Sequence, residues 1–293
     1  MATKVWTGAK DSNWADAANW NPAVVPVGGD DVVLIDNDVD IDTGLDQSLV
    51  TLASLKIDAT YRGKIGTMTA YLQVDPNTCW IGRSDGTGEP TGSTQIKLDF
   101  GAVAGCDTII YSSSSVSAMS NCPPICLIGD HAAHVFEIRS GSVGFALGPL
   151  ETSESCSRIH VGFVGDNSAG PDVIVGGGMT PATLVVNSGK CSYNGPSLAT
   201  GRCHGGELTL DTIGAVTNLT VRGGVCYPNA FTTLTACNAH GGMTDFTQTD
   251  ATRTVTAMNF YRGGSVNWSE SSGRFTLTNG VIQEAMTLTG LEI

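Results

Sequence analysis

The stretch from Gly205 to Gly224 reads GGELTLDTIGAVTNLTVRGG and predicts the fold. It contains two short runs in which an apolar residue, a threonine and an apolar residue alternate, Leu208–Leu210 and Leu219–Val221. Successive side chains of a β-strand point to opposite faces, so each run places its apolar residues on one face and its threonine on the other. Two such strands between glycine pairs predict one turn of a repeating β-structure.

The apolar-Thr-apolar pattern recurs through the last third of the chain. Its members are Leu208-Thr209-Leu210, Leu219-Thr220-Val221, Leu234-Thr235-Ala236, Val255-Thr256-Ala257, Phe275-Thr276-Leu277 and Met286-Thr287-Leu288. A second series consists of glycines expected at corners, because glycine adopts the positive φ of sharp turns: Gly189, Gly206, Gly224, Gly242, Gly264 and Gly280. Short strands and corners at a pitch near twenty residues predict stacked coils that share one core.

We therefore expect an all-β protein, a parallel β-solenoid (β-helix) whose body spans residues 46–293 and is most regular over 171–293. Residues 1–45 form a separate tryptophan-rich N-terminal cap or attachment segment, since three of the five tryptophans lie there. The alternative is an antiparallel β-sandwich or jelly roll, which also uses short strands. Few Asn-Gly or Asp-Gly pairs occur, which favours the solenoid over many tight hairpins.

Composition excludes several classes of protein. Hydrophobic residues make up 41% and charged residues 15% of the 293 residues, too apolar for a disordered chain. No apolar run approaches the ~18 residues of a membrane-spanning helix, so we expect no membrane partner. The net charge of −13 argues against nucleic acid as a partner, because phosphate binding needs a basic patch.

The opening of the chain carries a recognisable pattern: Val5-Trp6-Thr7-Gly8, Asn13-Trp14, Asn19-Trp20, Val25-Pro26 and Asp30-Asp31-Val32-Val33-Leu34. It resembles the segment that begins β-helical surface proteins, both autotransporter-like bacterial proteins and phage virion proteins. The resemblance covers about 35 of the 293 residues. It implies a β-helical architecture and carries little information about activity. Independently of it, a tryptophan-rich segment suits the exposed apolar end of a first coil.

The start Met-Ala-Thr-Lys-Val-Trp lacks the apolar core of a secretory signal, and the last residues do not resemble a membrane-barrel translocator. Virion proteins need neither. We therefore expect a structural protein of a phage particle, localised in the virion, that acts as a capsid decoration (cement) or fibre protein by binding other virion proteins. The alternatives are a tail fibre or tailspike that binds or cleaves host surface glycans, and a bacterial surface adhesin.

Assembly is expected to be homo-oligomeric. The final residues, Leu288 to Ile293, are strand-like and poor in charge, and an open strand edge invites pairing. Threefold assembly is implied only by the resemblance to phage fibres and spikes.

No enzymatic activity and no cofactor are expected, but four groups of residues were weighed as possible sites. Cys122, Cys126, His131 and His134 are zinc-type ligands at a spacing tighter than that of usual zinc fingers. We favour two small buried cysteines flanking a loop and two surface histidines there, with a local disulfide as an alternative, and we expect no metal site. The other seven cysteines are spread singly and are also expected to be buried and unpaired.

The acidic run from Asp36 to Asp42 lacks the glycine and the final glutamate of a calcium loop. We expect a strand with Asp38, Asp40 and Asp42 in solvent and Val39 and Ile41 in the core. Glycan cleavage would need two carboxylates, and no motif selects a pair among Asp245, Asp250, Glu270 and Glu284. Ser112–Ser115 has no recognisable base beside it. His160, His204 and His240 are interpreted as isolated structural histidines.

Overall fold

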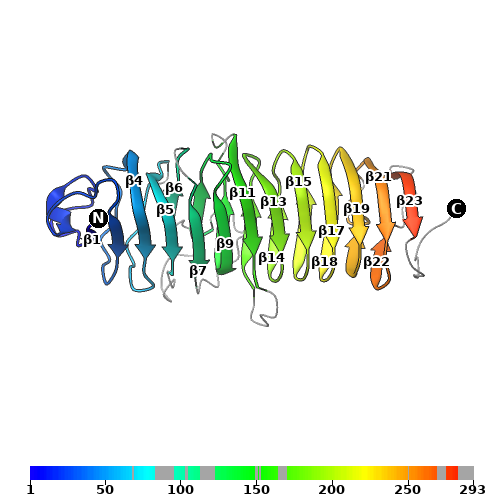
Figure 1. Ribbon diagram of the computed structural model, residues 1–293, viewed down its shortest axis with the longest axis horizontal. Coiled ribbons are helices and arrows are strands. Elements are labelled where there is room, and N and C mark those ends of the chain that lie inside the picture. The colour runs from blue at the N-terminus through cyan, green and yellow to red at the C-terminus, as the bar shows by residue number, and fades with distance from the viewer. Residues whose placement is uncertain are drawn as a thin grey trace.

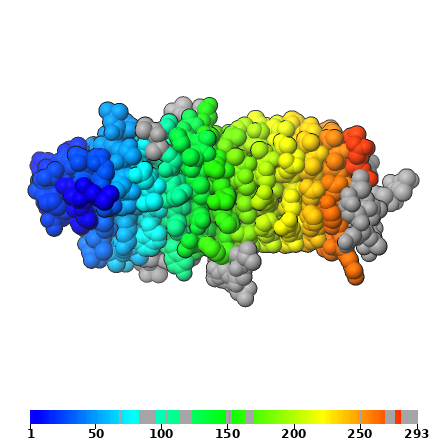
Figure 2. Space-filling model, in the orientation of Figure 1, coloured from blue at the N-terminus to red at the C-terminus, as the bar shows by residue number. Residues whose placement is uncertain are grey.

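The computed structural model shows a rod in which strands stack side by side along the long axis, with β1 near one end and β23 near the other (Figure 1). It describes residues 1–67, 69–82, 96–102, 105–112, 123–148, 151, 153–163, 170–249, 251–268 and 275–282. The space-filling view has the same elongated outline (Figure 2). Among the described residues, no helix has the length and apolar character needed to cross a membrane.

The strands form two series, a long one that begins at β1 and a short one that begins at β6. The long series contains β1 (Thr3–Trp6), β3 (Asp31–Leu34), β4 (Asp46–Ile57), β5 (Leu72–Ile81), β7 (Asp107–Tyr111), β9 (Val135–Ser140), β11 (Glu154–Val161), β13 (Met179–Val186), β15 (Leu198–Cys203), β17 (Val216–Val221), β19 (Thr233–Ala239), β21 (Arg253–Phe260) and β23 (Phe275–Ile282). The short series contains β6 (Ile96–Asp99), β8 (Ile125–Ile128), β10 (Ser142–Phe145), β12 (Asp172–Val175), β14 (Lys190–Tyr193), β16 (Glu207–Asp211), β18 (Val225–Ala230), β20 (Gly242–Asp245) and β22 (Gly264–Asn267). The remaining elements, the 3-10 helix η1 (Ala17–Asn19) and β2 (Trp20–Asn21), belong to the N-terminal segment.

Each strand pairs in parallel with the next member of its own series, one coil further along the rod. Between described strands, the only antiparallel pair is β1–β2. The expected parallel β-solenoid is therefore confirmed, and the antiparallel sandwich is wrong. Parallel neighbours arise because the chain returns to the same side of the rod once per coil.

Inward side chains stack on one another from coil to coil. In the short series one stack runs through Ile96, Ile125, Val143, Val173, Cys191, Leu208 and Cys226. In the long series a second stack runs through Leu34, Ile57, Ile81, Ile110, Ile138, Val161, Val186, Cys203, Val221 and Ala239. All of these side chains are buried in a single continuous core. Each coil therefore buries its apolar face only against its neighbours.

The strands of the long series bend, and at the bend the strict inward–outward alternation predicted from the sequence is wrong. Thr217 and Asn218 are both exposed between the buried Val216 and Leu219 of β17. At the same place in the next two coils, Ala236 and Ala257 lie on the outer side and pair with each other. A strand that passes a corner of the coil must direct two successive side chains outward. Ala236 and Ala257 are therefore not core residues, although the tripeptide pattern placed them there.

Four of the predicted corner glycines adopt the required conformation. Gly189, Gly206, Gly224 and Gly242 have φ of +75°, +64°, +65° and +65°, a region that favours glycine. Gly264 does not, because its neighbour Gly263 takes the positive φ of +92° in that corner. The prediction for Gly280 is also wrong, since this residue lies inside β23, opposite Met258 of β21.

Eight of the nine cysteines fall within the described residues, and all eight are free and buried. Burial raises the pKa of seven of these thiols, all except Cys126, for example to about 12 at Cys237 and about 11 at Cys203. A thiol with a raised pKa is a poor nucleophile and a poor metal ligand. These cysteines therefore act as small apolar residues of the stacks, as expected. Cys122 lies outside the described residues.

Candidate functional site: the tryptophan-rich cap

The centre of the N-terminal segment is a cluster of three buried indole rings. Trp20 packs edge-on against both other rings, with centroid distances of 5.1 Å to Trp6 and 4.7 Å to Trp14. Its Nε1–H donates a hydrogen bond of 2.7 Å to the carbonyl of Trp14. The Nε1–H of Trp6 donates to the carbonyl of Val39 at 3.2 Å. The cluster is apolar inside, and these two indole N–H groups are satisfied by backbone.

The cluster is joined directly to the first coil. Trp6 and Trp20 lie opposite each other in the antiparallel pair of β1 and β2. On its other side β1 pairs in parallel with β3, which pairs in turn with β4. Trp6 and Trp20 are therefore joined to the first strands of the rod through continuous strand pairing, and Trp14 packs against Trp20.

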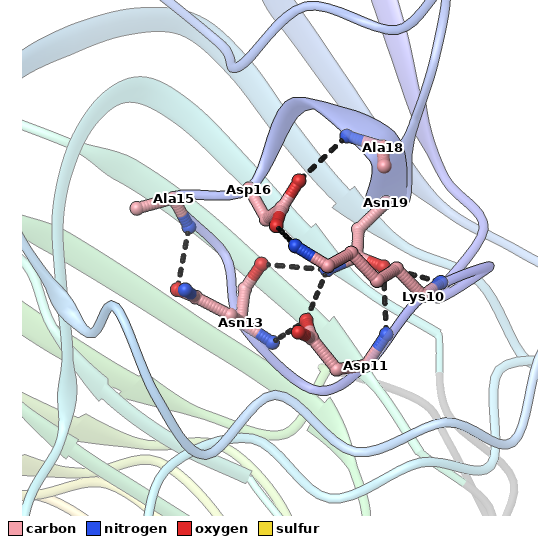
Figure 3. A network of polar contacts seen from close by, with 7 residues as sticks. All are labelled: Lys10, Asp11, Asn13, Ala15, Asp16, Ala18 and Asn19. Carbon is pink, nitrogen blue, oxygen red and sulfur yellow. Dashed lines mark hydrogen bonds and ion pairs between the residues drawn. The ribbon is translucent and has the colours of Figure 1, made fainter.

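A second, polar centre holds the loop of this cap (Figure 3). The side chain of Asn19 is fully buried, and its Oδ1 accepts hydrogen bonds from the backbone N–H of Lys10 (2.8 Å) and of Asp11 (3.0 Å). Its Nδ2 donates to Oδ1 of Asp11 at 2.6 Å and to the carbonyl of Asn13 at 2.9 Å. One amide thus satisfies four partners, which explains why asparagine rather than an apolar residue precedes Trp20.

The outer part of the same network is exposed to solvent. Asp16 caps η1 by accepting the N–H of Ala18 at 2.9 Å, and it forms an ion pair with Lys10. The hydrogen bond to Asp16 raises the pKa of Lys10, and the hydrogen bond from Lys10 lowers the pKa of Asp16. Because the pair is exposed, it shapes the surface of the cap rather than its stability.

Beside this network the cap presents apolar side chains to solvent. Val24 is 51% exposed and Val27 is 55% exposed, both in the loop that follows β2. The N–H of Gly29, at the end of that loop, donates to the carbonyl of Thr51 in β4. In β4 the pairing with β5 shifts between Asp46 and Thr51, and Leu49 in the shifted segment is 97% exposed. The rigid cap therefore offers apolar contact area at the N-terminal end of the rod.

The acidic run next to the cap is not the strand expected from its alternation. Residues 36–40 are irregular, and Ile41 alone forms a bridge, to Ile65. Ile41 is buried as predicted, and Asp38 and Asp42 are exposed. The half-buried Asp40 accepts the backbone N–H of Lys64 at 2.7 Å. Side-chain and backbone hydrogen bonds to neighbouring segments replace a strand ladder here.

His134, which its spacing groups with possible zinc ligands, uses both ring nitrogens in contacts with backbone atoms. The expectation of a surface histidine is wrong for His134, which is fully buried. Its Nδ1 accepts the N–H of Cys106 at 2.9 Å, and its Nε2 lies 3.1 Å from the carbonyl of Gly101. Both ring nitrogens are therefore occupied, and the second contact requires Nε2 to carry the proton. His131 packs beside it, with ring centroids 5.5 Å apart. Cys126 lies in β8, where its Sγ donates to the carbonyl of Pro123 at 3.8 Å.

Only one of the four acids considered for glycan cleavage, Asp245, lies within the described residues. Asp245 is buried, and hydrogen bonds from Thr247 and Gln248 lower its pKa against the opposing effect of burial. A lowered pKa is the opposite of what a general acid requires. Asp250, Glu270 and Glu284 lie outside the described residues. Ser112 is buried, and Ser113–Ser115 also lie outside the described residues.

Glu154, which no sequence motif singles out, has a raised rather than a lowered pKa. Burial raises the pKa of Glu154, whose carboxylate accepts the N–H of Gly129 at 2.9 Å. Nearby, Glu151 accepts the hydroxyl of Tyr71 at 2.5 Å. The sequence separation of 80 residues between Tyr71 and Glu151 left no local signal for this contact. The pair therefore joins segments that are distant in the chain.

Comparison with known protein families, with curated protein sequences and with solved structures finds no match for this chain.

Proposed function

We propose that this chain is a non-enzymatic structural protein of a phage particle, a capsid decoration or fibre protein located in the virion, that binds other virion proteins through its N-terminal cap. The cap and the rod would then have separate roles. The cap would attach, and the solenoid would project from the point of attachment.

The observation that carries this proposal is the construction of the cap. Its apolar indole rings all face inward, and a buried asparagine fixes its loop, so the cap is rigid before any partner binds. A preorganised surface loses little conformational entropy on association. Val24 and Val27 remain exposed on it, next to the exposed Leu49 of the adjoining β4, and exposed apolar groups beside polar ones are typical of protein contact sites.

We further propose self-association of the rods, most simply as a trimer. One outer column of the long series carries small side chains, Thr183, Thr200, Asn218, Ala236 and Ala257, on successive coils. Such a column allows the backbones of neighbouring rods to approach closely. Light scattering on the purified chain should give three times the mass of one chain, 30.3 kDa. A monomer at micromolar concentration would contradict self-association.

Attachment is tested on particles. The protein should be found on purified phage particles by immunogold labelling. Val24→Asp/Val27→Asp should reduce its incorporation at least tenfold, because charged side chains would replace the apolar contact. Ile213→Asp is the matched control, since Ile213 is 83% exposed on the rod between β16 and β17, away from the cap.

Unchanged melting temperatures would establish that both variants fold. Absence of the protein from particles would overturn the proposal and favour a surface adhesin. Equal incorporation of the two variants would remove the cap as the attachment site.

A further inference from the structure

The residues that directly follow the last inward side chain of each coil form a straight column along one edge of the rod. Successive members are Asn187, His204, Arg222, His240 and Tyr261. The N–H of each donates to the carbonyl of the last inward residue of the preceding coil, as from Arg222 to Cys203 and from His240 to Val221. Strand pairing thus continues one residue into each corner and keeps these side chains in register.

A neighbouring outer column on the same edge adds further basic groups. Glu137, His160, Val185 and Arg202 are successive partners in the pairings of β9, β11, β13 and β15. Arg139, Arg158 and Arg262 lie one or two residues from members of these columns. We call the whole set the basic edge, and it comprises Arg139, Arg158, His160, Arg202, His204, Arg222, His240, Tyr261 and Arg262.

The basic edge concentrates positive charge on an otherwise acidic protein. It holds five of the nine arginines and three of the five histidines of a chain whose net charge is −13. Arg158, Arg202, Arg222 and Arg262 are exposed, and no carboxylate of the described residues forms an ion pair with them. Glu137 is paired with Arg139 at 3.2 Å.

The charges along this edge are close enough to act on one another. Burial lowers the pKa of His204, and the charges of Arg222, Arg202 and His160 lower it further. Like charges held together with a single paired carboxylate, Glu137, raise the free energy of the isolated protein, and an anionic ligand would relieve that repulsion. Neighbouring rings are also ordered, since His240 and Tyr261 stack with centroids 3.8 Å apart.

The geometry points to a binding site for a linear acidic polysaccharide along this edge, with its carboxylate groups on the arginines. Arginine binds carboxylates through paired hydrogen bonds, and the imidazole and phenol groups can donate to sugar hydroxyls. A straight column suits an extended polymer better than the curved surface of a folded acidic protein. The inference does not depend on where a phage particle carries the chain.

Charge density separates this ligand from nucleic acid. The basic edge spans seven coils from β9 to β21, which at about 4.8 Å per coil is about 30 Å, or one arginine per about 6 Å. Duplex DNA carries one charge per about 1.7 Å, and each of its strands one per about 3.4 Å. A polymer with one carboxylate per sugar ring is charged more sparsely, and it suffers less repulsion from the rest of this acidic protein.

The test measures binding of the full chain to polygalacturonate, alginate and hyaluronate at low and high salt, with neutral dextran and oligo(dT) as comparison polymers. We expect at least one acidic polysaccharide to bind, with an affinity that falls at least tenfold from 50 to 500 mM NaCl. Arg202→Gln/Arg222→Gln should weaken this binding at least tenfold. Lys64→Gln/Lys190→Gln removes the same charge from exposed positions off this edge and should change it less than twofold.

Several results would overturn the inference: no binding to any of the three acidic polymers, equal loss in both double variants, or tighter binding of oligo(dT). Salt-sensitive self-association that disappears in Arg202→Gln/Arg222→Gln would instead assign the edge to contacts between copies of the chain. Unchanged melting temperatures of the variants exclude misfolding as the cause of any loss. Tyr261→Ala should weaken binding about threefold, and Tyr261→Phe should lose only the contribution of the hydroxyl.

Discussion

The tryptophan-rich cap and the regular coils from Asp172 to Asp245 are built from the same short strands but stabilised differently. In the coils, each inward residue is held by the equivalent residues of the coils before and after it. In the cap, single side chains have unique partners, as Asn19 has with Lys10, Asp11 and Asn13. A coil position therefore requires a type of residue, whereas a cap position requires a particular residue.

This difference explains why the stacks vary while their character stays apolar. Leucine, cysteine and valine alternate at equivalent levels, and Gly201 stands in the stack where the neighbouring coil has Leu219. A Cβ atom on Gly201 would lie 3.3 Å from Cδ1 of Leu219, so the larger residue occupies space that the glycine leaves. A smaller side chain in one coil can therefore be compensated by a larger one in the next coil. A cap residue with one set of partners has no such neighbour.

The largest effect is expected from a charge placed in the middle of the coils. Leu219→Asp would place a carboxyl group among buried apolar side chains, and we expect a loss of more than about 4 kcal/mol in unfolding free energy. Thr220→Asp, one residue along on the outer side, should cost less than about 1 kcal/mol. Chemical denaturation measures both. Similar losses at the two positions would mean that their side chains do not point to opposite sides.

The next effect should be confined to the cap. Trp20→Ala removes the ring that contacts both other indoles, and we expect a loss of about 3–5 kcal/mol. Hydrogen exchange should show lost protection over residues 1–45 with unchanged protection over 172–245, because each coil contacts only its neighbours. Trp20→Phe should retain most of the protection. Uniform loss along the rod would show that cap and coils unfold together.

A corner glycine tests the backbone of the coils rather than their core. Gly224→Val should destabilise by about 1–3 kcal/mol, since φ is +65° and the new Cβ would lie 2.2 Å from the carbonyl oxygen of Gly206. Gly280→Ala, inside β23, should change stability by less than about 1 kcal/mol. Thermal unfolding compares the two variants. An unchanged melting temperature for Gly224→Val would contradict the assignment of Gly224 to a strained corner.

The smallest effect is a pH dependence carried by His134. Burial lowers its pKa below the ordinary 6.5, so the unfolded chain binds the proton first as the pH falls. Its contribution to stability is complete above about pH 6.5, decreases below that value, and levels off once the folded imidazole is also protonated. We expect the unfolding free energy to decrease between pH 7 and pH 5, and we expect this decrease to be absent in His134→Gln. Parallel pH profiles of the two proteins would assign the dependence to other groups.

Alternation and glycine spacing predicted the solenoid because both are local consequences of strand geometry. They failed at Ala236 and Ala257, where the strand bends, and at Gly264 and Gly280, where only φ shows which glycine makes the corner. His134 looked like a possible metal ligand because sequence does not reveal that Cys106 and Gly101 supply its hydrogen bonds. The grouping of the four possible zinc ligands rested on chain spacing alone.

The histidines show most clearly the difference between what the sequence reveals and what only the tertiary structure reveals. His160, His204 and His240 look isolated in the sequence, because they are 44 and 36 residues apart. The number of residues per coil decides which of them lie on one edge, and that number varies between coils with the length of each corner. The sequence by itself determined the parallel solenoid class and most of the corner glycines. Only the tertiary structure decided the register between coils, and hence which charged side chains stand together, because register depends on distant segments fitting one shared core.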